Sequence, residues 1–292
     1  MDQVTIRTAE TPADYRALQE AQRRAWGIVD DTTILPVATM ASARHHGGFV
    51  AGAFLPEGVA VGVSFGFLGR IDGRLCLYSQ LTGVVPGYQS RGLGLRLKEA
   101  QREFCRAEGI DLIAWAFDPL QAGNAHFNLQ KLGATCRRIV PDMYGPRTDA
   151  LNAGFPTDRL IAQWEIDAVP PAALSADEAR ELPRVLVRPP ISEIERRGLS
   201  TGIMALIEVQ GHDMPWSTLP EGPRSLLEIP SSIFEMRRDN PGRAMSWQLS
   251  VSNALAVCFE MGYRAVGFVT TQEVGEARDR SHYVLERGAG GS

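Results

Sequence analysis

Hydrophobic positions in residues 1–166 follow two spacings, one typical of strands and one typical of helices. Alternating or unbroken apolar runs predict strands, while apolar residues three to four apart predict helices. The predicted strands are 4–10, 49–55, 59–68, 75–85, 110–117, 134–140 and 159–166. The predicted helices are 11–26, 36–46, 93–107 and 124–132. A doubly wound Rossmann domain alternates strand and helix throughout. The order predicted here does not alternate in this way, so it does not indicate a Rossmann domain.

The pattern changes after residue 166. Residues 167–190 carry two Pro-Pro pairs around a short charged segment and predict a linker with one or two helical turns. Residues 191–287 predict a second α/β domain. Its predicted strands are 203–209, 225–229, 263–270 and 282–286, and its amphipathic helix is 244–261. Residues 288–292 predict a disordered tail.

The second domain repeats part of the first in its order of elements. A strand, a connection, a long helix ending in glycine and an apolar strand describe both 75–117 and 225–270. One interpretation is a degenerate second copy of the same core, which would close a substrate pocket or form a homodimer. The other is that many α/β domains share this order. The connection at 237–243 contains no Gly-x-Gly, so a copy would not bind phosphate there.

Composition and charge narrow the classes of function. The chain has 292 residues and a formal net charge of −4, without a basic run, which disfavours nucleic acid as a partner. The start lacks a charged-then-apolar leader, and no stretch approaches the ~20 apolar residues of a membrane span. Cys76, Cys105, Cys136 and Cys258 lie far apart, which predicts a reducing cytoplasm and no metal site. For Cys105 a small, buried or half-buried side chain is favoured over a nucleophile.

The stretch 84–98 carries the clearest candidate chemistry. The strand 75–85 runs into a short turn containing Gly92 and Gly94 and then into a helix. The buried face of that helix is predicted to carry Leu93, Leu97, Ala100, Phe104 and Ala107, with Arg91, Arg96, Lys98 and Arg102 mostly elsewhere. The first N–H groups of a helix have no intrahelical partner and favour an anion, and glycine lets a phosphate approach the backbone.

Three phosphate-binding patterns are compared with this turn. A P-loop requires Lys-Ser or Lys-Thr after its second glycine, and neither follows here. A dinucleotide fingerprint requires a third glycine at the position of Leu97. The pattern Gln/Arg-x-x-Gly-x-Gly/Ala is met by Gln89-Ser90-Arg91-Gly92-Leu93-Gly94. A turn without a ligand remains the structural alternative.

The six-residue pattern and the order of elements together resemble the GNAT superfamily of acyl-CoA-dependent N-acyltransferases. The resemblance implies an α/β (α+β) fold with a central mixed, splayed sheet flanked by helices. It implies an acyl-CoA such as acetyl-CoA as donor, with pyrophosphate on the amides of Gln89, Ser90, Arg91, Gly92, Leu93 and Gly94. It also implies contacts from pantetheine to the backbone of Leu81, Thr82, Gly83, Val84 and Val85. Asn124 and Asn128 are further candidates for the coenzyme, although Asn128 fits a helix-surface role equally well.

The same resemblance leaves the general acid open. Many members of the superfamily have a tyrosine shortly before a Lys-x-Gly helix end, and this chain has Leu129 there. Tyr144 is the favoured replacement, with an aromatic side chain packed under its loop as the alternative. Asp118 is the candidate for accepting the amine's proton, although capping of the local turn is the simpler role.

Two further runs, 127–134 and 142–145, resemble a two-domain bacterial subgroup associated with N-acylation, including N-succinylation, of amino acids. The resemblance implies a small amine or amino acid as acceptor. Independently of it, Arg44, Arg70 and Arg74 are candidate partners for a carboxylate on either substrate. A non-catalytic acyl-CoA-binding protein is the alternative from another class, because leucine cannot protonate a leaving thiolate. Acylation of a protein amine is a third hypothesis.

Overall fold

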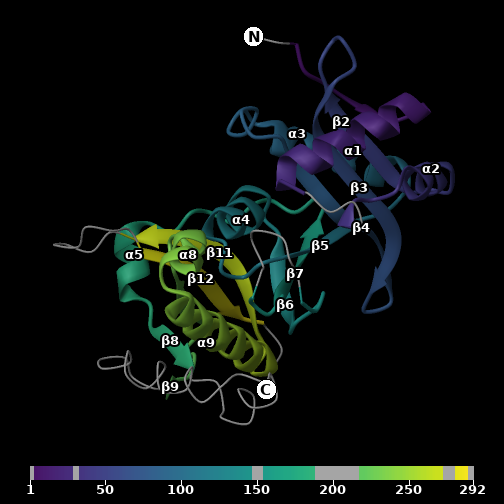
Figure 1. Ribbon diagram of the computed structural model, residues 1–292. Helices are drawn as coiled ribbons and strands as arrows, with labels where there is room; N and C mark the ends of the chain where they lie inside the picture. Colours follow the sequence, from purple (N-terminus) through teal and green to yellow (C-terminus); the bar gives the residue numbers. More distant parts are fainter. Residues whose placement is uncertain (1–2, 29–32, 147–153, 188–216, 272–279, 289–292) are drawn as a thin grey trace. The chain divides into compact units, whose positions relative to one another are not determined.

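The computed structural model describes residues 3–28, 33–146, 154–187, 217–271 and 280–288. The chain forms two compact units (Figure 1). Unit 1 comprises residues 1–115 and 163–167, and unit 2 comprises residues 116–162 and 168–292. Both units have mixed α/β architecture, with strands in mixed sheets and helices against them. No described helix combines the length and apolar composition that crossing a bilayer requires.

Unit 1 is built on five strands in the order β1-β2-β3-β4-β5. The first four pair antiparallel, and β4 pairs with β5 in parallel. Their bounds are β1 Thr5–Thr8, β2 Phe49–Phe54, β3 Ala60–Ile71, β4 Arg74–Val84 and β5 Leu112–Phe117, the last two residues of which belong to unit 2.

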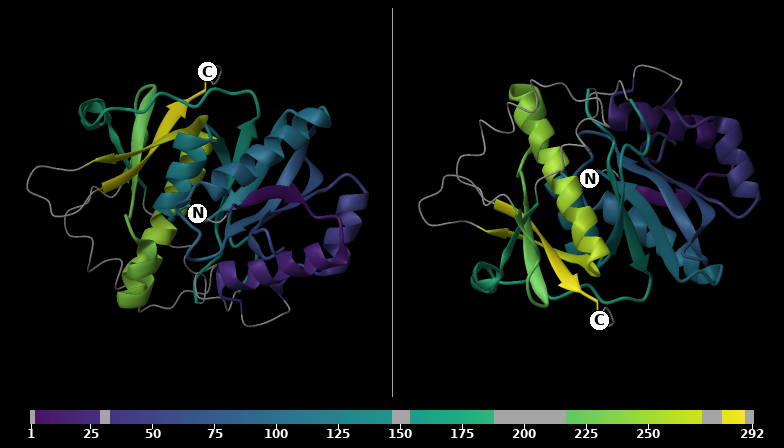
Figure 2. Two further views of the ribbon diagram at one scale, coloured as in Figure 1. Left: turned by 90° about the horizontal axis from the view of Figure 1, so that it is seen from above. Right: turned by 90° about the horizontal axis from the view of Figure 1, so that it is seen from below.

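Helices cover both faces of this sheet. The helices α1 (Pro12–Trp26) and α2 (Val37–His45) lie on one face and α3 (Leu93–Ala107) on the other (Figure 2). Successive residues of β3 show the division, since side chains alternate along a strand. Phe65 packs with the α1 cluster, whereas the Ser64 hydroxyl accepts a hydrogen bond from Gln101 of α3.

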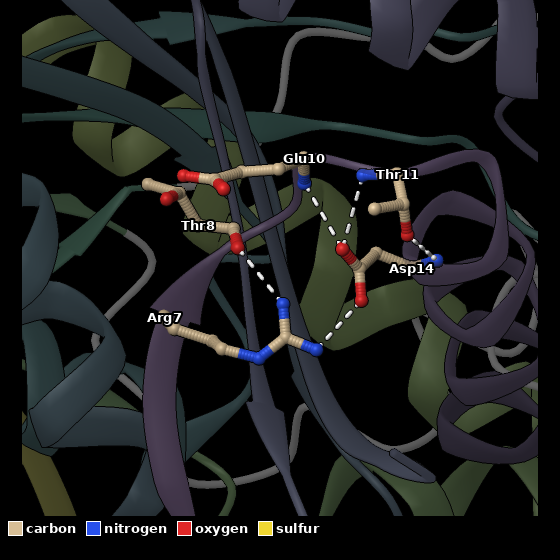
Figure 3. Close-up of polar contacts among 5 residues, drawn as sticks. All are labelled: Arg7, Thr8, Glu10, Thr11 and Asp14. Atoms are coloured by element: carbon tan, nitrogen blue, oxygen red, sulfur yellow. Dashed lines mark hydrogen bonds and ion pairs between the residues drawn. The ribbon is translucent and has the colours of Figure 1, made fainter.

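The start of α1 illustrates how the sequence defines an element locally. Thr11 and Asp14 form a reciprocal capping box, and Pro12 occupies the first turn. The Asp14 carboxylate accepts hydrogen bonds from the N–H groups of Glu10 and Thr11 and from Arg7 (Figure 3). These donors lower the pKa of Asp14, the bond from Arg7 being the largest cause. The ionised cap therefore stabilises α1 above the acid range.

Unit 2 contains strands in the order β6-β11-β12-β10-β8-β9. Their bounds are β6 Thr135–Val140, β8 Arg184–Val187, β9 Ser217–Thr218, β10 Arg224–Ile229, β11 Tyr263–Thr271 and β12 Arg280–Arg287. Its helices are α4 Ala122–Ala125, the π-helix η2 His126–Lys131, α5 Ala176–Glu181, α8 Ile233–Asp239 and α9 Pro241–Glu260. The strand β7 (Arg159–Glu165) contributes its first four residues to unit 2 and its last three to unit 1.

The predicted elements of residues 3–166 are all present, with ends shifted by a few residues. The four later elements that fall on described residues, at 225–229, 244–261, 263–270 and 282–286, are also confirmed. Within the predicted linker 167–190, the expected helical turns are present as α5, and an additional strand, β8, pairs in parallel with β10. The predicted strand 203–209 and residues 289–292 of the predicted tail lie outside the described residues.

The compact units divide the chain differently from the expected domains 1–166 and 191–287. Residues 116–162 pack with the C-terminal half, since Ala265 of β11 pairs with Cys136 of β6. The Tyr283 hydroxyl also donates to the carbonyl of Pro119 at 2.7 Å. The expected domain limits follow the order of elements in the sequence, whereas the units follow these long-range contacts.

Candidate functional site

One edge of β4 is left without a strand partner. The pairs between β4 and β5 are Leu77–Ile113 and Tyr78–Ala114, and no further pair joins the described residues of these strands. On its other side β4 stays paired with β3 as far as Val84. Backbone groups of 79–84 that point away from β3 are therefore available to an extended ligand, because an unpaired strand edge presents a row of N–H and C=O groups.

A β-bulge lies where this free edge begins. Ser79 pairs with Gly66 and Leu81 pairs with Phe65, so Gln80 is an extra residue in β4. Ser79 points toward α3, whereas Leu81 packs toward the α1 cluster. The bulge thereby turns the exposed Gln80 side chain out of the ladder. Bulges are common beside functional sites because they redirect side chains.

The turn after β4 presents the bare N-terminus of α3. Gly87, Ser90 and Gly92 have φ values of 88°, 60° and 77°, so the turn depends on left-handed backbone. Gly92 provides no side-chain cap, and the N–H groups of Leu93, Gly94 and Leu95 have no hydrogen-bond partner in the described part of the chain. A Cβ at Gly92 or Gly94 would meet open space, so the backbone can be approached closely.

Unit 1 thus brings together the predicted coenzyme-binding residues 81–85 and 89–94. Residues 81–84 of the first group run along the free edge of β4, and the second group forms the turn that follows. Val85 lies just beyond the strand, and its N–H and carbonyl are hydrogen-bonded to Val61 and Tyr88. The Gln89 side chain donates to the carbonyl of Val84 at 3.0 Å and closes the turn. Arg96 donates to the carbonyl of Val4 at 3.0 Å, and Arg91 lies 5.1 Å from the Tyr88 ring centroid.

A buried group of polar side chains lies between β4 and α3, and we call it the polar cluster. It consists of Ser64, Ser79, Thr82, Lys98 and Gln101. The Lys98 ammonium lies 3.0 Å from the Ser79 hydroxyl and 3.7 Å from the centroid of the Trp115 ring. Gln101 donates to both serine hydroxyls at 2.8 Å, while its buried carbonyl oxygen has no hydrogen-bond partner.

The sequence prediction for α3 missed this cluster. Lys98 was expected off the buried face and Ala107 on it, but Lys98 is 4% exposed and Ala107 is exposed. The buried face runs through Leu93, Leu97, Gln101 and Cys105 at steps of four, which also turns Lys98 inward. The spacing of four residues from Leu97 to Gln101 indicates that Gln101 continues the buried face. A prediction that assigns only hydrophobic residues to buried positions does not detect it. The buried thiol predicted for Cys105 is confirmed, and burial raises its pKa to about 12.

A hollow of about 580 Å³ lies on the opposite face of unit 1, at the bulge. Its lining is uncharged and comes from α2, β3 and β4: Ala38, Thr39, Ser42, Ala43, Phe65, Phe67 and Gln80. Two of the arginines expected to bind a carboxylate are engaged elsewhere. Arg74 pairs with Glu165 at 2.7 Å and Asp111 at 3.1 Å, and Arg70 donates to the carbonyl of Gly73 at 2.7 Å.

In unit 2, Asp118 has the surroundings of a structural carboxylate. It is 7% exposed, and one oxygen accepts the N–H of Leu120 at 2.9 Å in a local turn. The other oxygen lies 3.1 Å from the guanidinium of Arg237, whose own side chain is buried. A buried ion pair of this kind restricts the access of the carboxylate to a substrate. These contacts favour the capping role.

Tyr144 lies on an ordered turn of unit 2 with its side chain 45% exposed. Its N–H donates to the Thr157 hydroxyl at 2.9 Å, and its ring lies 5.3 Å from the guanidinium carbon of Arg159. The neighbouring Asp142 has a left-handed φ of 44° and accepts the N–H of Thr157. An exposed ring on a fixed turn does not fit the alternative of an aromatic side chain packed under the loop.

Asn124, Asn128 and Leu129 lie in or beside the π-helix η2 of unit 2. Asn124 is exposed and donates to Gln121 at 3.3 Å, whereas Asn128 is buried. Leu129 is fully buried, so this position contributes to the core of unit 2 rather than to a polar site. Single π-helical turns are frequent at functional sites. The helix predicted at 124–132 therefore begins as the α-helix α4 at Ala122 and continues as the π-helix η2 from His126 to Lys131.

No protein-family model and no curated protein matches the chain. Among solved structures it is similar to yncA from Salmonella typhimurium, solved with acetyl-CoA, at 23% identity and a TM-score of 0.46. That similarity covers 58% of this chain and 99% of the other. The ribosomal-protein-S18-alanine N-acetyltransferase of Escherichia coli follows at 20% identity and 0.43, covering 59% and 99% of the two chains. A GNAT-family acetyltransferase from Streptococcus pneumoniae gives 19% and 0.43, covering 55% and 98%.

Proposed function

We propose that this protein is an acyl-CoA-dependent N-acyltransferase of the GNAT type, acting on a small amine such as an amino acid. The observation that carries the proposal is the continuity of two features in unit 1. The free edge of β4 over 79–84 leads directly into the uncapped N-terminus of α3. An extended arm with an anionic end matches this pair of features, and acyl-CoA has that form.

The chain's own groups fit such a donor. The N–H groups of Leu93, Gly94 and Leu95 are free to bind pyrophosphate, and the helix dipole favours negative charge at the same place. The backbone groups of 81–84 that face away from β3 would pair with the amides of pantetheine as a neighbouring strand would, except for the Val84 carbonyl, which Gln89 already holds. Arg91 lies in the same turn, where a guanidinium favours phosphate.

The hollow at the bulge is the candidate acceptor site. It opens beside Gln80, where the free edge begins, and its lining carries no charge. The lining contains no carboxylate that would hold the amine as an ammonium, and the neutral amine is the nucleophilic form. Arg44, on α2, is the candidate partner for an acceptor carboxylate, because Arg70 and Arg74 hold other groups.

Transfer forms a bond between the amine nitrogen and the acyl carbon and breaks the bond from that carbon to sulfur. The thiolate takes up one proton and the amine loses one. Tyr144 remains the proposed acid, because its phenol is exposed on a fixed turn and Leu129 cannot donate. Asp118 is the weaker proposal for the base, because Arg237 and the local turn already hold its carboxylate.

Release of free thiol from acetyl-CoA and succinyl-CoA tests the proposal, measured across a panel of amines and both enantiomers of amino acids. We expect release that depends on an amine and is saturable in both substrates. A protein that neither binds coenzyme A nor releases thiol would contradict the proposal.

The buried Leu129 favours a second candidate, a protein that binds acyl-CoA without turnover. Tyr144→Phe separates the two. A loss of turnover of roughly 100-fold or more, with unchanged affinity for coenzyme A, supports an enzyme whose acid has moved to Tyr144. Coenzyme binding without turnover by the unmodified protein supports the non-catalytic alternative.

A further inference from the structure

Lys98 lies at the fork where β4 and β5 stop pairing. Tyr78 and Ala114 form the last pair between these strands. The next residue on β4 is Ser79, whose hydroxyl lies 3.0 Å from Lys98 Nζ. The next residue on β5 is Trp115, whose ring centroid lies 3.7 Å from the same nitrogen. The amine of Lys98 therefore contacts one side chain from each strand, one residue beyond their last pair.

The fork holds a buried amine without a negative partner. No ion pair joins Lys98 to a carboxylate anywhere in the described ranges, and its neighbours are a hydroxyl and the face of an indole. Burial lowers the pKa of Lys98 to about 7, because desolvation penalises the ammonium. A charge in such a place is costly unless an anion pairs with it. The chain has only two lysines, Lys98 and Lys131, among its 30 Lys and Arg residues.

The polar cluster around Lys98 has unused hydrogen-bonding capacity. Lys98 has three potential donors and one hydrogen-bonded protein acceptor, Ser79. The carbonyl oxygen of Gln101 is buried without a hydrogen-bond partner. Ser79 and Thr82 add hydroxyls on the same side of β4, and a hydroxyl can donate or accept. The cluster is equipped to bind a polar group that arrives at the fork, and its amine selects an anion.

The proposed donor site leads to the fork. An arm anchored at the α3 N-terminus would follow β4 back from Val84 to Ser79, a distance of roughly 17 Å for five residues. The acyl group is carried at the far end of that arm. It would therefore be delivered beside Ser79, within reach of Lys98.

We propose that Lys98 binds a carboxylate at the end of the acyl group, which makes the donor a dicarboxylic acyl-CoA rather than acetyl-CoA. The inference rests on the proposed function, since it assigns the acyl end of the same donor. Lys98 here determines specificity and takes no part in bond making, while Ser79 and the Trp115 ring hold its amine in place.

The experiment is a calorimetric titration of the full-length protein with coenzyme A, butyryl-CoA and succinyl-CoA, which requires no acceptor. Succinyl and butyryl chains have similar length and differ in the terminal charge. We expect succinyl-CoA to bind roughly 10- to 100-fold more tightly than butyryl-CoA, as for a buried charged hydrogen bond. Lys98→Met should remove this preference. Lys131→Met, the same change at the other, exposed lysine, should preserve it.

The possible outcomes separate the two proposals. If none of the three compounds binds, the donor site itself is refuted. If all three bind and butyryl-CoA equals succinyl-CoA, the donor site stands and the role of Lys98 is refuted. The comparison within the unmodified protein decides the matter even if Lys98→Met does not fold.

A pH series adds a readout that a structural role would not produce. The preference for succinyl-CoA should shrink well above pH 7, where Lys98 loses its proton. The titratable group that acts on the pKa of Lys98 is Cys105 of the same helix, whose own pKa is raised to about 12. From β4 and β5, the side chains that contact Lys98 are Ser79 and Trp115, which are uncharged. A preference that is constant from pH 6 to pH 9 would count against Lys98.

Discussion

Two segments of the chain have the same order of elements but differ in how their strands pair. In unit 1, β4 and β5 are parallel neighbours joined at two positions, so most of one edge of β4 is free. In unit 2, β10 and β11 are not neighbours, because β12 lies between them. It pairs with β10 over 224–229 and with β11 over 263–271, which leaves no comparable gap.

The two long helices of these segments, α3 and α9, also differ in whether a side chain caps their N-terminus. Gly92 leaves α3 uncapped, whereas the Asn240 side chain accepts the N–H of Arg243 at the start of α9. Pro241 supplies no N–H at the first helical position. The proposed coenzyme site combines a free strand edge with an uncapped helix, and of these two segments only the one in unit 1 has both. The resemblance between the halves is one of element order and not of strand adjacency.

The largest effect should come from giving α3 the kind of cap that α9 has. Gly92→Asp adds a hydrogen-bond acceptor and a negative charge where pyrophosphate is proposed to bind. We expect affinity for coenzyme A to fall by roughly 100-fold or more, because like charges in contact cost several kcal/mol. Calorimetry measures the change.

Gly109→Asp is the matched control for that substitution. Gly109 follows the other end of α3, also has left-handed backbone (φ 67°) and also faces open space. Its replacement should leave coenzyme affinity unchanged. Equal losses in both variants would mean that backbone strain, and not the anion site, caused the effect.

A smaller effect concerns the contact that supports the free edge. A Cβ on Gly83 would lie 2.3 Å from the Trp26 ring, so Gly83→Ala must displace α1 or β4. We expect a loss of about 2 kcal/mol in the free energy of unfolding, typical of overpacking. Gly94→Ala adds the same methyl to open space and should not destabilise the protein. Urea unfolding of both variants makes the comparison, and similar midpoints would contradict the proposed packing role.

The buried amine at the fork should appear as a pH dependence above pH 7, whereas the buried His282 of unit 2, whose pKa is lowered to about 3, acts at lower pH. The folded pKa of Lys98, about 7, lies below that of the unfolded chain, so the unfolded state binds more protons above pH 7. The stability difference between the unmodified protein and Lys98→Met should rise with pH by up to about 1.4 kcal/mol per unit above pH 7. The four buried thiols, whose raised pKa values give an opposite slope as thiols of the unfolded chain ionise, are common to both proteins. Urea unfolding of both proteins across this pH range measures the difference. If the variant and the unmodified protein show the same pH dependence of the free energy of unfolding, the titrating group is not Lys98.

The smallest effect is expected from uncapping α9. Asn240→Ala should cost about 1 kcal/mol of stability, as for other helix caps. It should give no affinity for coenzyme A at 237–243, because no free strand edge leads into that turn. New coenzyme binding by this variant would show that an uncapped helix alone is sufficient.

The predictability of the structure differs between its parts. The capping box at Thr11, the glycine turn at Gly92 and the strand and helix order all follow from local patterns. The buried polar cluster did not, because a lysine and a glutamine on a helix are usually solvent-exposed. Their burial depends on Ser64 and Ser79, which arrive from strands far away in the sequence.

The residues alone therefore reveal a strand followed by an uncapped helix, because dihedral preferences, caps and hydrophobic spacing act over a few positions. They do not reveal that the pairing of β4 with β5 ends at Tyr78 and Ala114. Nor do they reveal that β12 lies between β10 and β11. Those features depend on which distant segments pair, and pairing is set by packing of the whole unit. The 84–98 stretch supplies a candidate turn in either case. The free edge and the buried lysine beside it exist only in the folded protein.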